Sequence, residues 1–253
     1  MSTFFLSDIG ALTGRTLRHV TRSPDTIVTT AITPIVMLVM FVYVFGGAID
    51  TGGVTYVNYL LPGILLITVA SGVAYTSLRL YTDVSGGMFE RFQSMPIARS
   101  AVLWAHVLTS LIANLVSLVL VVLVALAIGF RSGAGVAAWL GVLGILVLFT
   151  LALTWLAVSA GLVARSPDGA GAFAYPLLFL PFLSSAFVPT TGMSGPVQWF
   201  AEHQPVTSTV DTLRDLYADQ PPGNDLWVAL AWCVGLLVVA HALAVRTYHR
   251  RFA

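Results

Sequence analysis

The amino-acid sequence predicts an all-α integral membrane protein with six transmembrane helices. Of its 253 residues, 57% are hydrophobic and only 9% are charged, whereas ordinary soluble domains carry roughly 25% charged residues. Most of the residues also fall into apolar runs long enough to span a bilayer, which leaves little chain for a separate soluble domain. We therefore expect a single membrane domain over residues 1–253.

The first element expected is an amphipathic helix over residues 2–22 that lies on the membrane surface. Phe5, Ile9 and Leu12 recur at roughly helical spacing, while Arg15 and Arg18 can face away from them. A cleavable signal peptide would instead place its positive charge ahead of a short apolar core and a small-residue cleavage site. We therefore expect this segment to remain part of the protein.

Six apolar stretches follow, and each is long enough to cross a hydrocarbon layer of about 30 Å as a helix. They cover residues 26–45, 57–80, 102–128, 136–163, 171–188 and 226–245. The fifth stretch is the shortest, and Pro176 and Pro181 each remove a backbone donor within it. A kinked or broken helix is expected there, where protein or water must satisfy the freed carbonyl groups.

The positions of the arginines indicate the orientation, because cytoplasmic segments near the spans carry the excess of positive charge. With the N-terminus inside, ten of the twelve arginines are cytoplasmic, and only Arg131 and Arg214 lie outside. Both termini, including the tail over residues 246–253, are therefore expected in the cytoplasm.

The composition excludes several classes of function. All twelve basic residues are arginine, which excludes a phosphate-loop lysine and a lysine Schiff base. Cys233 is the only cysteine, so no internal disulfide or cysteine-rich metal site can form. No charged residue lies in the central part of an expected span, although ion-coupled carriers usually need one. We expect no catalytic residue, metal site, cofactor or nucleic-acid partner.

Three polar side chains stand out within the expected spans. His106 and His241 are expected toward the cytoplasmic ends, where an interfacial ring is ordinary. Asn114 is deeper, and we interpret it as an interhelical hydrogen-bonding group rather than a substrate ligand.

The loop over residues 79–100, between the second and third expected spans, has an apolar centre. Gly86, Gly87 and Pro96 bound a short helix, whose exposed face is expected to carry Met88, Phe89, Phe92 and Met95. Exposed Met and Phe clusters rimmed by charge mark protein contacts, so the loop is interpreted as a docking site for a soluble partner. The alternative is that this cluster folds back on the protein's own helices.

The external segment over residues 189–225 carries two short expected helices, 196–202 and 205–217. These helices can dip into the outer leaflet, or they can form a surface cap that covers the bundle. Trp199 and Phe200 suit a membrane interface in either case.

Several motifs, in the same order along nearly the whole chain, resemble the membrane subunits of type-2 ABC exporters, in particular the daunorubicin-resistance family of drug and lipid exporters. The matching segments are YLLPGI at 59–64, ERFQSMPI at 90–97, residues 182–200 with FVPT at 187–190, PVT at 205–207, and LR at 213–214.

The resemblance implies a non-catalytic permease subunit of a bacterial plasma membrane. Two permeases, identical or sister subunits, would sit on a pair of separate ABC ATPase subunits that bind ATP and magnesium. The family's cytoplasmic coupling helix, which enters a groove on the ATPase, corresponds to residues 88–96, with Glu90 and Arg91 as polar contacts. The surface helix corresponds to residues 2–22. The family's outer-leaflet helices correspond to an external site with Trp199, Phe200, Pro205, Leu213 and Arg214.

The expected function is ATP-driven export of a hydrophobic or amphipathic small molecule, or a lipid, out of the cytoplasm or the inner leaflet. Such export would confer multidrug or antibiotic resistance. A pathway lined by apolar side chains without charge rings suits such a cargo better than an ion. The alternative is a proton-coupled secondary multidrug carrier, which the lack of intramembrane carboxylates disfavours. The sequence leaves open the cargo, the transport direction, and whether the partner permease is a copy or a sister.

Overall fold

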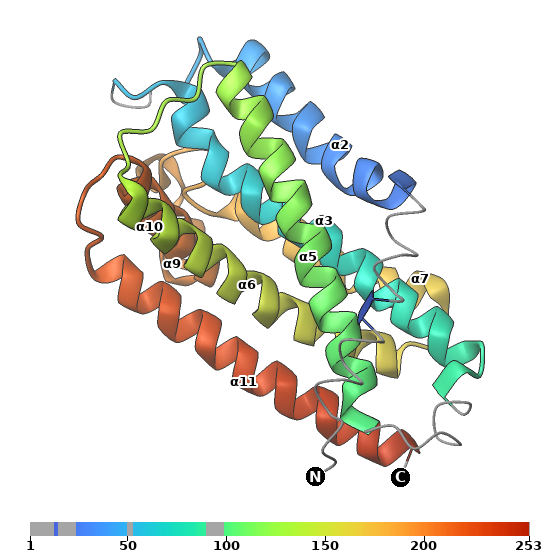
Figure 1. The fold of residues 1–253 in the computed structure, drawn as a ribbon. Helices are drawn as coiled ribbons and strands as arrows, with labels where there is room; N and C mark the ends of the chain where they lie inside the picture. Colours follow the sequence, from blue (N-terminus) through green and yellow to red (C-terminus); the bar gives the residue numbers. More distant parts are fainter. Residues whose placement is uncertain (1–12, 15–23, 50–52, 90–98, 253) are drawn as a thin grey trace.

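The computed structural model describes residues 13–14, 24–49, 53–89 and 99–252. Within these residues, all regular secondary structure is helical, and four helices are long and apolar enough to cross a membrane (Figure 1). They are α3 (Tyr56–Ser85), α5 (Arg99–Ala127), α6 (Val136–Val163) and α11 (Asn224–Phe252). They coincide with four of the six expected spans, so the prediction of a helical, multi-pass membrane protein is confirmed at this level. The predicted surface helix over residues 2–22 lies almost wholly outside the described residues.

The first expected span corresponds to a shorter apolar helix. It consists of α2 (Pro24–Met40), which contains Pro34, and the π-helical turn η1 (Phe41–Phe45). Helix α2 packs against α3 and α5. The segment runs toward the end of the bundle at which α3 begins, since Gly46 lies next to the Tyr56 ring.

The fifth expected span is broken, as its two prolines predict. Instead of one continuous helix, the chain forms α7 (Pro167–Ala172), α8 (Ala174–Phe179) and the 3-10 turn η2 (Leu180–Leu183). Ser166 caps α7, because its Oγ accepts a hydrogen bond from the Gly169 N–H at 3.1 Å. All three pieces pack against α3, and we call residues 167–188 the broken segment.

Helices α6 and α11 run side by side in the same direction (Figure 1). The Ser159 hydroxyl donates to the Ala240 carbonyl at 3.1 Å, and Arg251 reaches the Leu162 carbonyl near the end of α6. The chain between these two helices must therefore return from the end of the bundle where α6 stops to the end where α11 begins. The broken segment, α9 (Gly195–His203) and α10 (Pro205–Tyr217) make that return.

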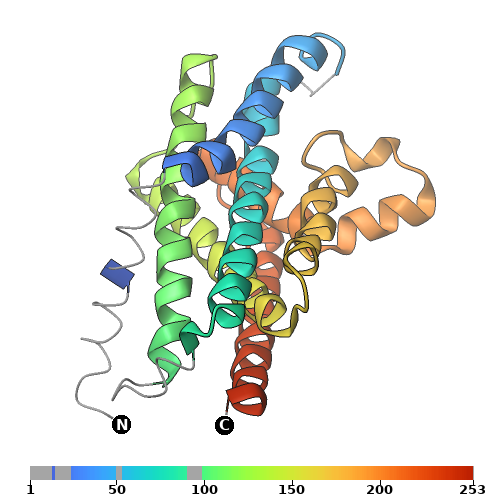
Figure 2. The ribbon, with the colours of Figure 1, turned by 90° about the vertical axis from the view of Figure 1, so that its right-hand side faces the viewer.

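The two ends of the bundle are held by different contacts. At the inner end, which the arginine distribution predicts to be cytoplasmic, His106 Nε2 lies 3.3 Å from an Asp83 carboxylate oxygen. At the outer end, Asn58 Nδ2 donates to the Arg131 carbonyl at 2.7 Å. Helix α3 is the most deeply buried of the four long helices and connects both ends. Figure 2 shows α9 standing out from the bundle on the side of the broken segment.

Candidate functional site

The first residues of the loop predicted over 79–100 form the last turns of α3, and the helix ends at Ser85. Gly87 adopts φ 70°, a left-handed conformation that glycine accommodates without a Cβ clash, and the chain turns there. Phe89 is only 2% exposed, and its ring centroid lies 6.1 Å from that of Tyr248 on α11. Met88 is half-buried. For Phe89, therefore, the structure favours the alternative in which the cluster folds back on the protein's own helices.

The other predicted coupling residues, Glu90, Arg91, Phe92, Met95 and Pro96, lie outside the described residues. The described part of the loop leads into a set of buried side chains from α3, α5, α6 and α11, which we call the inner cluster. Its members are Leu80, Phe89, Val102, Leu103, Val107, Trp155, Val158, Leu162, Ala240, Ala244 and Tyr248. This cluster joins the loop to the inner ends of four helices. Because packed side chains transmit displacement, a movement of the loop would shift the inner ends of all four helices.

Among the predicted external residues, Arg214 makes the most polar contacts. Its guanidinium donates to the backbone carbonyls of Tyr59 at 3.0 and 3.1 Å, Ser185 at 2.6 Å and Ala186 at 3.2 Å. It also lies 2.7 Å from an Asp211 carboxylate oxygen and 3.7 Å from the centroid of the Tyr59 ring. We call this group the Arg214 clamp. It joins α10 to the first turns of α3 and to the end of the broken segment.

The clamp forms because the chain around Ser185 and Ala186 is not helical, so these two carbonyls have no donor within a helix. Buried carbonyls need a partner, and arginine offers five N–H donors in a planar fork. Gly63 allows the close approach, since a Cβ at this position would lie 2.6 Å from the Ala186 Cβ. The glycine of the YLLPGI motif thus lets α3 touch the broken segment.

Two more side chains satisfy the carbonyls of the broken segment. Gln204 Nε2 donates to the Leu180 carbonyl at 3.1 Å and to the Leu183 carbonyl at 2.7 Å. The Ser184 hydroxyl donates to the Pro181 carbonyl at 2.6 Å. These protein groups satisfy carbonyls at the end of the broken segment, where the chain stops being helical.

The other predicted external residues fall into two groups. Leu213 is fully buried, and Pro205 begins α10, which packs against α3, α6 and α11. Trp199 and Phe200, on α9, are 64% and 43% exposed. Helix α10 thus covers the bundle as a cap, while α9 presents aromatic side chains outward.

Sequence reasoning missed the partners of Arg214. Asp211 lies three residues before it on the same face of α10, and this spacing is a signal that could have identified the pair. Burial raises the pKa of the Asp211 carboxyl above its ordinary value, while the Arg214 guanidinium and the Ser185 hydroxyl act in the opposite direction. Most of the other partners are backbone carbonyls, which leave no signature in a sequence; the Tyr59 ring and the Ser185 hydroxyl are the side chains among them.

Comparison with known proteins agrees with this architecture. The family model described as ABC-2 type transporter matches residues 7–217. The daunorubicin resistance ABC transporter permease protein DrrB1 of Streptomyces coeruleorubidus is 28% identical over 249 residues, which cover 94% of this chain and 87% of that protein. The probable doxorubicin resistance ABC transporter permease protein DrrC of Mycobacterium tuberculosis is 23% identical over 243 residues, with coverage of 94% and 87%.

Another relative is the putative transport permease ycf38 of Porphyra purpurea, which is 26% identical over 221 residues, or 85% of this chain and 75% of that protein. The family match extends over most of the chain, from before the first described helix to the end of α10. The chain therefore belongs to the ABC-2 type transporter family, as a multi-pass membrane permease subunit.

Proposed function

We propose that this chain is the permease subunit of an ATP-driven exporter that moves a hydrophobic or amphipathic small molecule, or a lipid, out of the cytoplasm or the inner leaflet. Membership of the ABC-2 family implies partnership with an ABC ATPase subunit. In the assembly proposed here, two permeases, copies or sisters, sit on a pair of ATPases that bind ATP and magnesium. This chain contributes no cofactor of its own.

The observation that carries this proposal is the continuity of α3. At its inner end this helix leads into the coupling loop and the inner cluster, and at its outer end it is held by the Arg214 clamp. A helix of 30 residues is about 45 Å long at 1.5 Å per residue. A push on the loop by a closing ATPase would therefore reach the external segment through one rigid element.

The topology that we propose has six crossings. Residues 24–45 and the broken segment cross the bilayer together with the four long helices, and both termini are cytoplasmic. The return of the chain between the parallel helices α6 and α11 supports a crossing by the broken segment. Residues 2–22 lie on the inner surface of a bacterial plasma membrane, and α9 and α10 face the outer leaflet.

The names of two relatives support an apolar or amphipathic cargo, since they refer to daunorubicin and doxorubicin resistance. In the described long helices, charged residues lie toward the ends rather than at the middle. A proton-coupled secondary carrier usually needs an ionisable group inside the membrane, so this arrangement counts against that alternative. Membership of the ABC-2 family does not favour it either.

The test is reconstitution of the chain with its ATPase in vesicles, with cargo movement followed in the presence of ATP or of a proton gradient alone. We expect movement only with ATP and the ATPase. Uphill transport by the purified permease without a nucleotide-hydrolysing partner would refute the proposal.

The coupling role is tested separately, with Phe92→Ala. This variant should keep its membrane insertion and the ATPase activity of the complex but lose cargo movement, because the docking contact is weakened. A matched control is Leu143→Ala on the exposed face of α6, which should transport normally. Normal transport by Phe92→Ala would show that Phe92 is not part of the coupling site.

A further inference from the structure

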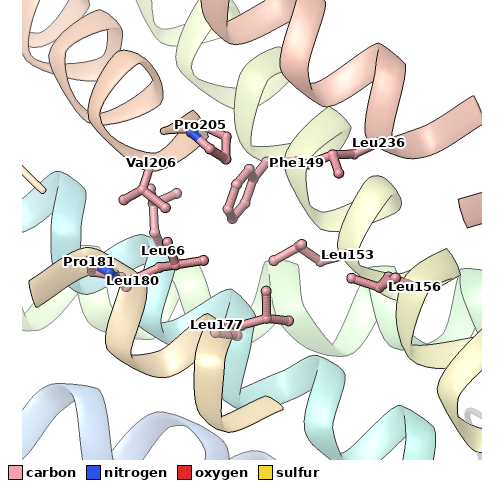
Figure 3. Close-up of a pocket in the computed structure, with 11 residues that line it drawn as sticks. Leu66, Phe149, Leu153, Leu156, Leu177, Leu180, Pro181, Pro205, Val206 and Leu236 are labelled. Carbon is pink, nitrogen blue, oxygen red and sulfur yellow. The ribbon is translucent and has the colours of Figure 1, made fainter. Parts of the chain in front are cut away.

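A cavity of about 130 Å³ lies where α3, α6, α10, α11 and the broken segment meet (Figure 3). All of its lining residues are apolar: Leu66, Ala70, Phe149, Leu153, Leu156, Leu177, Leu180, Pro181, Pro205, Val206 and Leu236. A buried water needs two to four polar partners, and these side chains offer none. The cavity is therefore suited to an apolar occupant.

The lining has a buried wall and a half-buried rim. The half-buried members are Leu156, Leu177, Leu180, Pro205 and Leu236, and the other members are buried. Beside the rim, Phe179 and Val239 are 64% and 57% exposed. The cavity thus reaches the surface on the apolar outside of the bundle, which faces the bilayer in the topology proposed above.

The depth of the cavity corresponds to the middle of a bilayer. Leu66 lies ten residues after Tyr56, the first residue of α3, and Leu236 lies twelve residues after Asn224, the first residue of α11. At 1.5 Å per residue, both lie about 15–18 Å along the axis from the first residue of their own helix. Half of a hydrocarbon core is about 15 Å thick, so the ends of lipid tails lie at this level.

The volume restricts the occupant further. An engineered cavity of about 150 Å³ lined by Leu, Ile and Phe binds benzene, which has six carbon atoms. The cavity here is slightly smaller, at about 130 Å³. It has room for the last few carbons of an alkyl chain, but not for a multi-ring drug or a polar headgroup.

We propose that this cavity binds the terminal carbons of an acyl chain from a membrane phospholipid. Lipid tails are the most abundant apolar groups at this depth, and their ends are free to enter from the side. The inserted chain end fills the space between the broken segment and helices α6 and α11. It thereby stabilises the part of the bundle that has the least continuous helix. The site is independent of the cargo and does not rest on the proposed transport function.

The test uses the purified full chain in lipid nanodiscs whose phospholipid carries a diazirine at the end of one acyl chain. After photolysis, mass spectrometry of the peptides should find adducts on Leu153 and Leu177. The same lipid with its diazirine near the carboxyl end of the chain should not label these residues. Equal labelling by both lipids, or labelling confined to exposed residues such as Val239, would overturn the proposal.

Ala70→Leu supplies the matched variant, because it adds three carbons from the buried wall into the cavity. The Ala70→Leu variant should lose most of the adducts at Leu153. The control, Ala231→Leu, adds the same three carbons on the exposed face of α11 and should keep the adducts at Leu153. If Ala70→Leu does not fold, Ala70→Val makes the same test with a smaller insertion. Unchanged adducts in the folded variant would refute the site.

Thermal unfolding gives a second readout. The Tm of the wild-type protein should depend on the acyl chain length of the nanodisc lipid more strongly than the Tm of the filled variant. If both respond equally to chain length, the cavity is either a dry void or is covered by a second copy of the chain, and the proposal fails.

Discussion

Replacement of Arg214 by alanine should destabilise the outer half of the protein. The substitution removes the cation next to Asp211 and leaves the Tyr59, Ser185 and Ala186 carbonyls without this donor. Breaking a fully buried ion pair by removing one partner costs about 3–5 kcal/mol. The Arg214 and Asp211 side chains are 18% and 32% exposed, so we expect a smaller loss of about 2–4 kcal/mol after discounting for solvent screening. For a chain of this size, that loss lowers Tm by roughly 5–15 °C.

The assay is thermal unfolding of the purified protein in nanodiscs, followed by circular dichroism. Arg131→Ala is the matched control, since Arg131 is an exposed arginine at the same end of the bundle. Its Nη1 donates to the carbonyls of Leu126 and Phe130, close to the end of α5. It should lower Tm by only a few degrees, roughly 1 kcal/mol in free energy.

A double-mutant cycle tests the reasoning more directly. Much of the cost of Arg214→Ala is the half-buried Asp211 carboxylate that loses its cationic partner. In that background, Asp211→Asn should therefore cost less than it does alone, with an interaction energy of about 1–2 kcal/mol. Additive costs, or an unchanged Tm for Arg214→Ala, would show that the clamp does not hold the external segment.

Three further predictions follow from packing and charge. Gly161→Ala should lower Tm, because its Cβ would lie 2.7 Å from the Ser77 backbone carbonyl of α3; Gly144→Ala on the same helix meets nothing within 4 Å and should not lower Tm. Phe89→Ala should lower the free energy of unfolding by about 3–5 kcal/mol in a denaturant titration, since a buried ring leaves a cavity; an unchanged midpoint would contradict its burial. The folded-state pKa of Asp211 is raised above its ordinary 3.8, so the Asp211 contribution to stability should fall as the pH rises from 3.8 through the folded-state pKa. Thermal melts over this pH range should show that fall in the wild-type protein but not in Asp211→Asn. An identical dependence of Tm on pH in the two proteins would contradict the prediction.

Hydropathy predicted the long helices well but not their ends. The apolar run over residues 57–80 lies within α3, which continues to Ser85, and the run over 226–245 lies within α11, which continues to Phe252. A helix continues past its apolar run whenever the next residues can also adopt helical geometry, so apolarity marks the membrane part and not the whole helix. The break at Pro176 and Pro181 was predictable because proline removes a backbone donor.

The sites were less predictable. Arg214 was singled out by resemblance, but its carbonyl partners come from residues that are far away in the sequence. The face assigned to the coupling loop assumed one helix from Met88 onward. Met88 and Phe89 are helical, as a helix starting there requires, but Phe89 packs against Tyr248 of α11. A helical periodicity cannot show which way a short helix faces after a flexible turn.

The broken segment has a consequence for biogenesis. Its carbonyls at Leu180, Leu183 and Ala186 receive donors from Gln204 and Arg214, which are synthesised after it. While the nascent chain ends before these residues, the segment cannot be stable in lipid on its own, because carbonyls without donors are costly there. We therefore expect its stable integration to follow the synthesis of α10, which makes the cap a folding partner of the segment that precedes it.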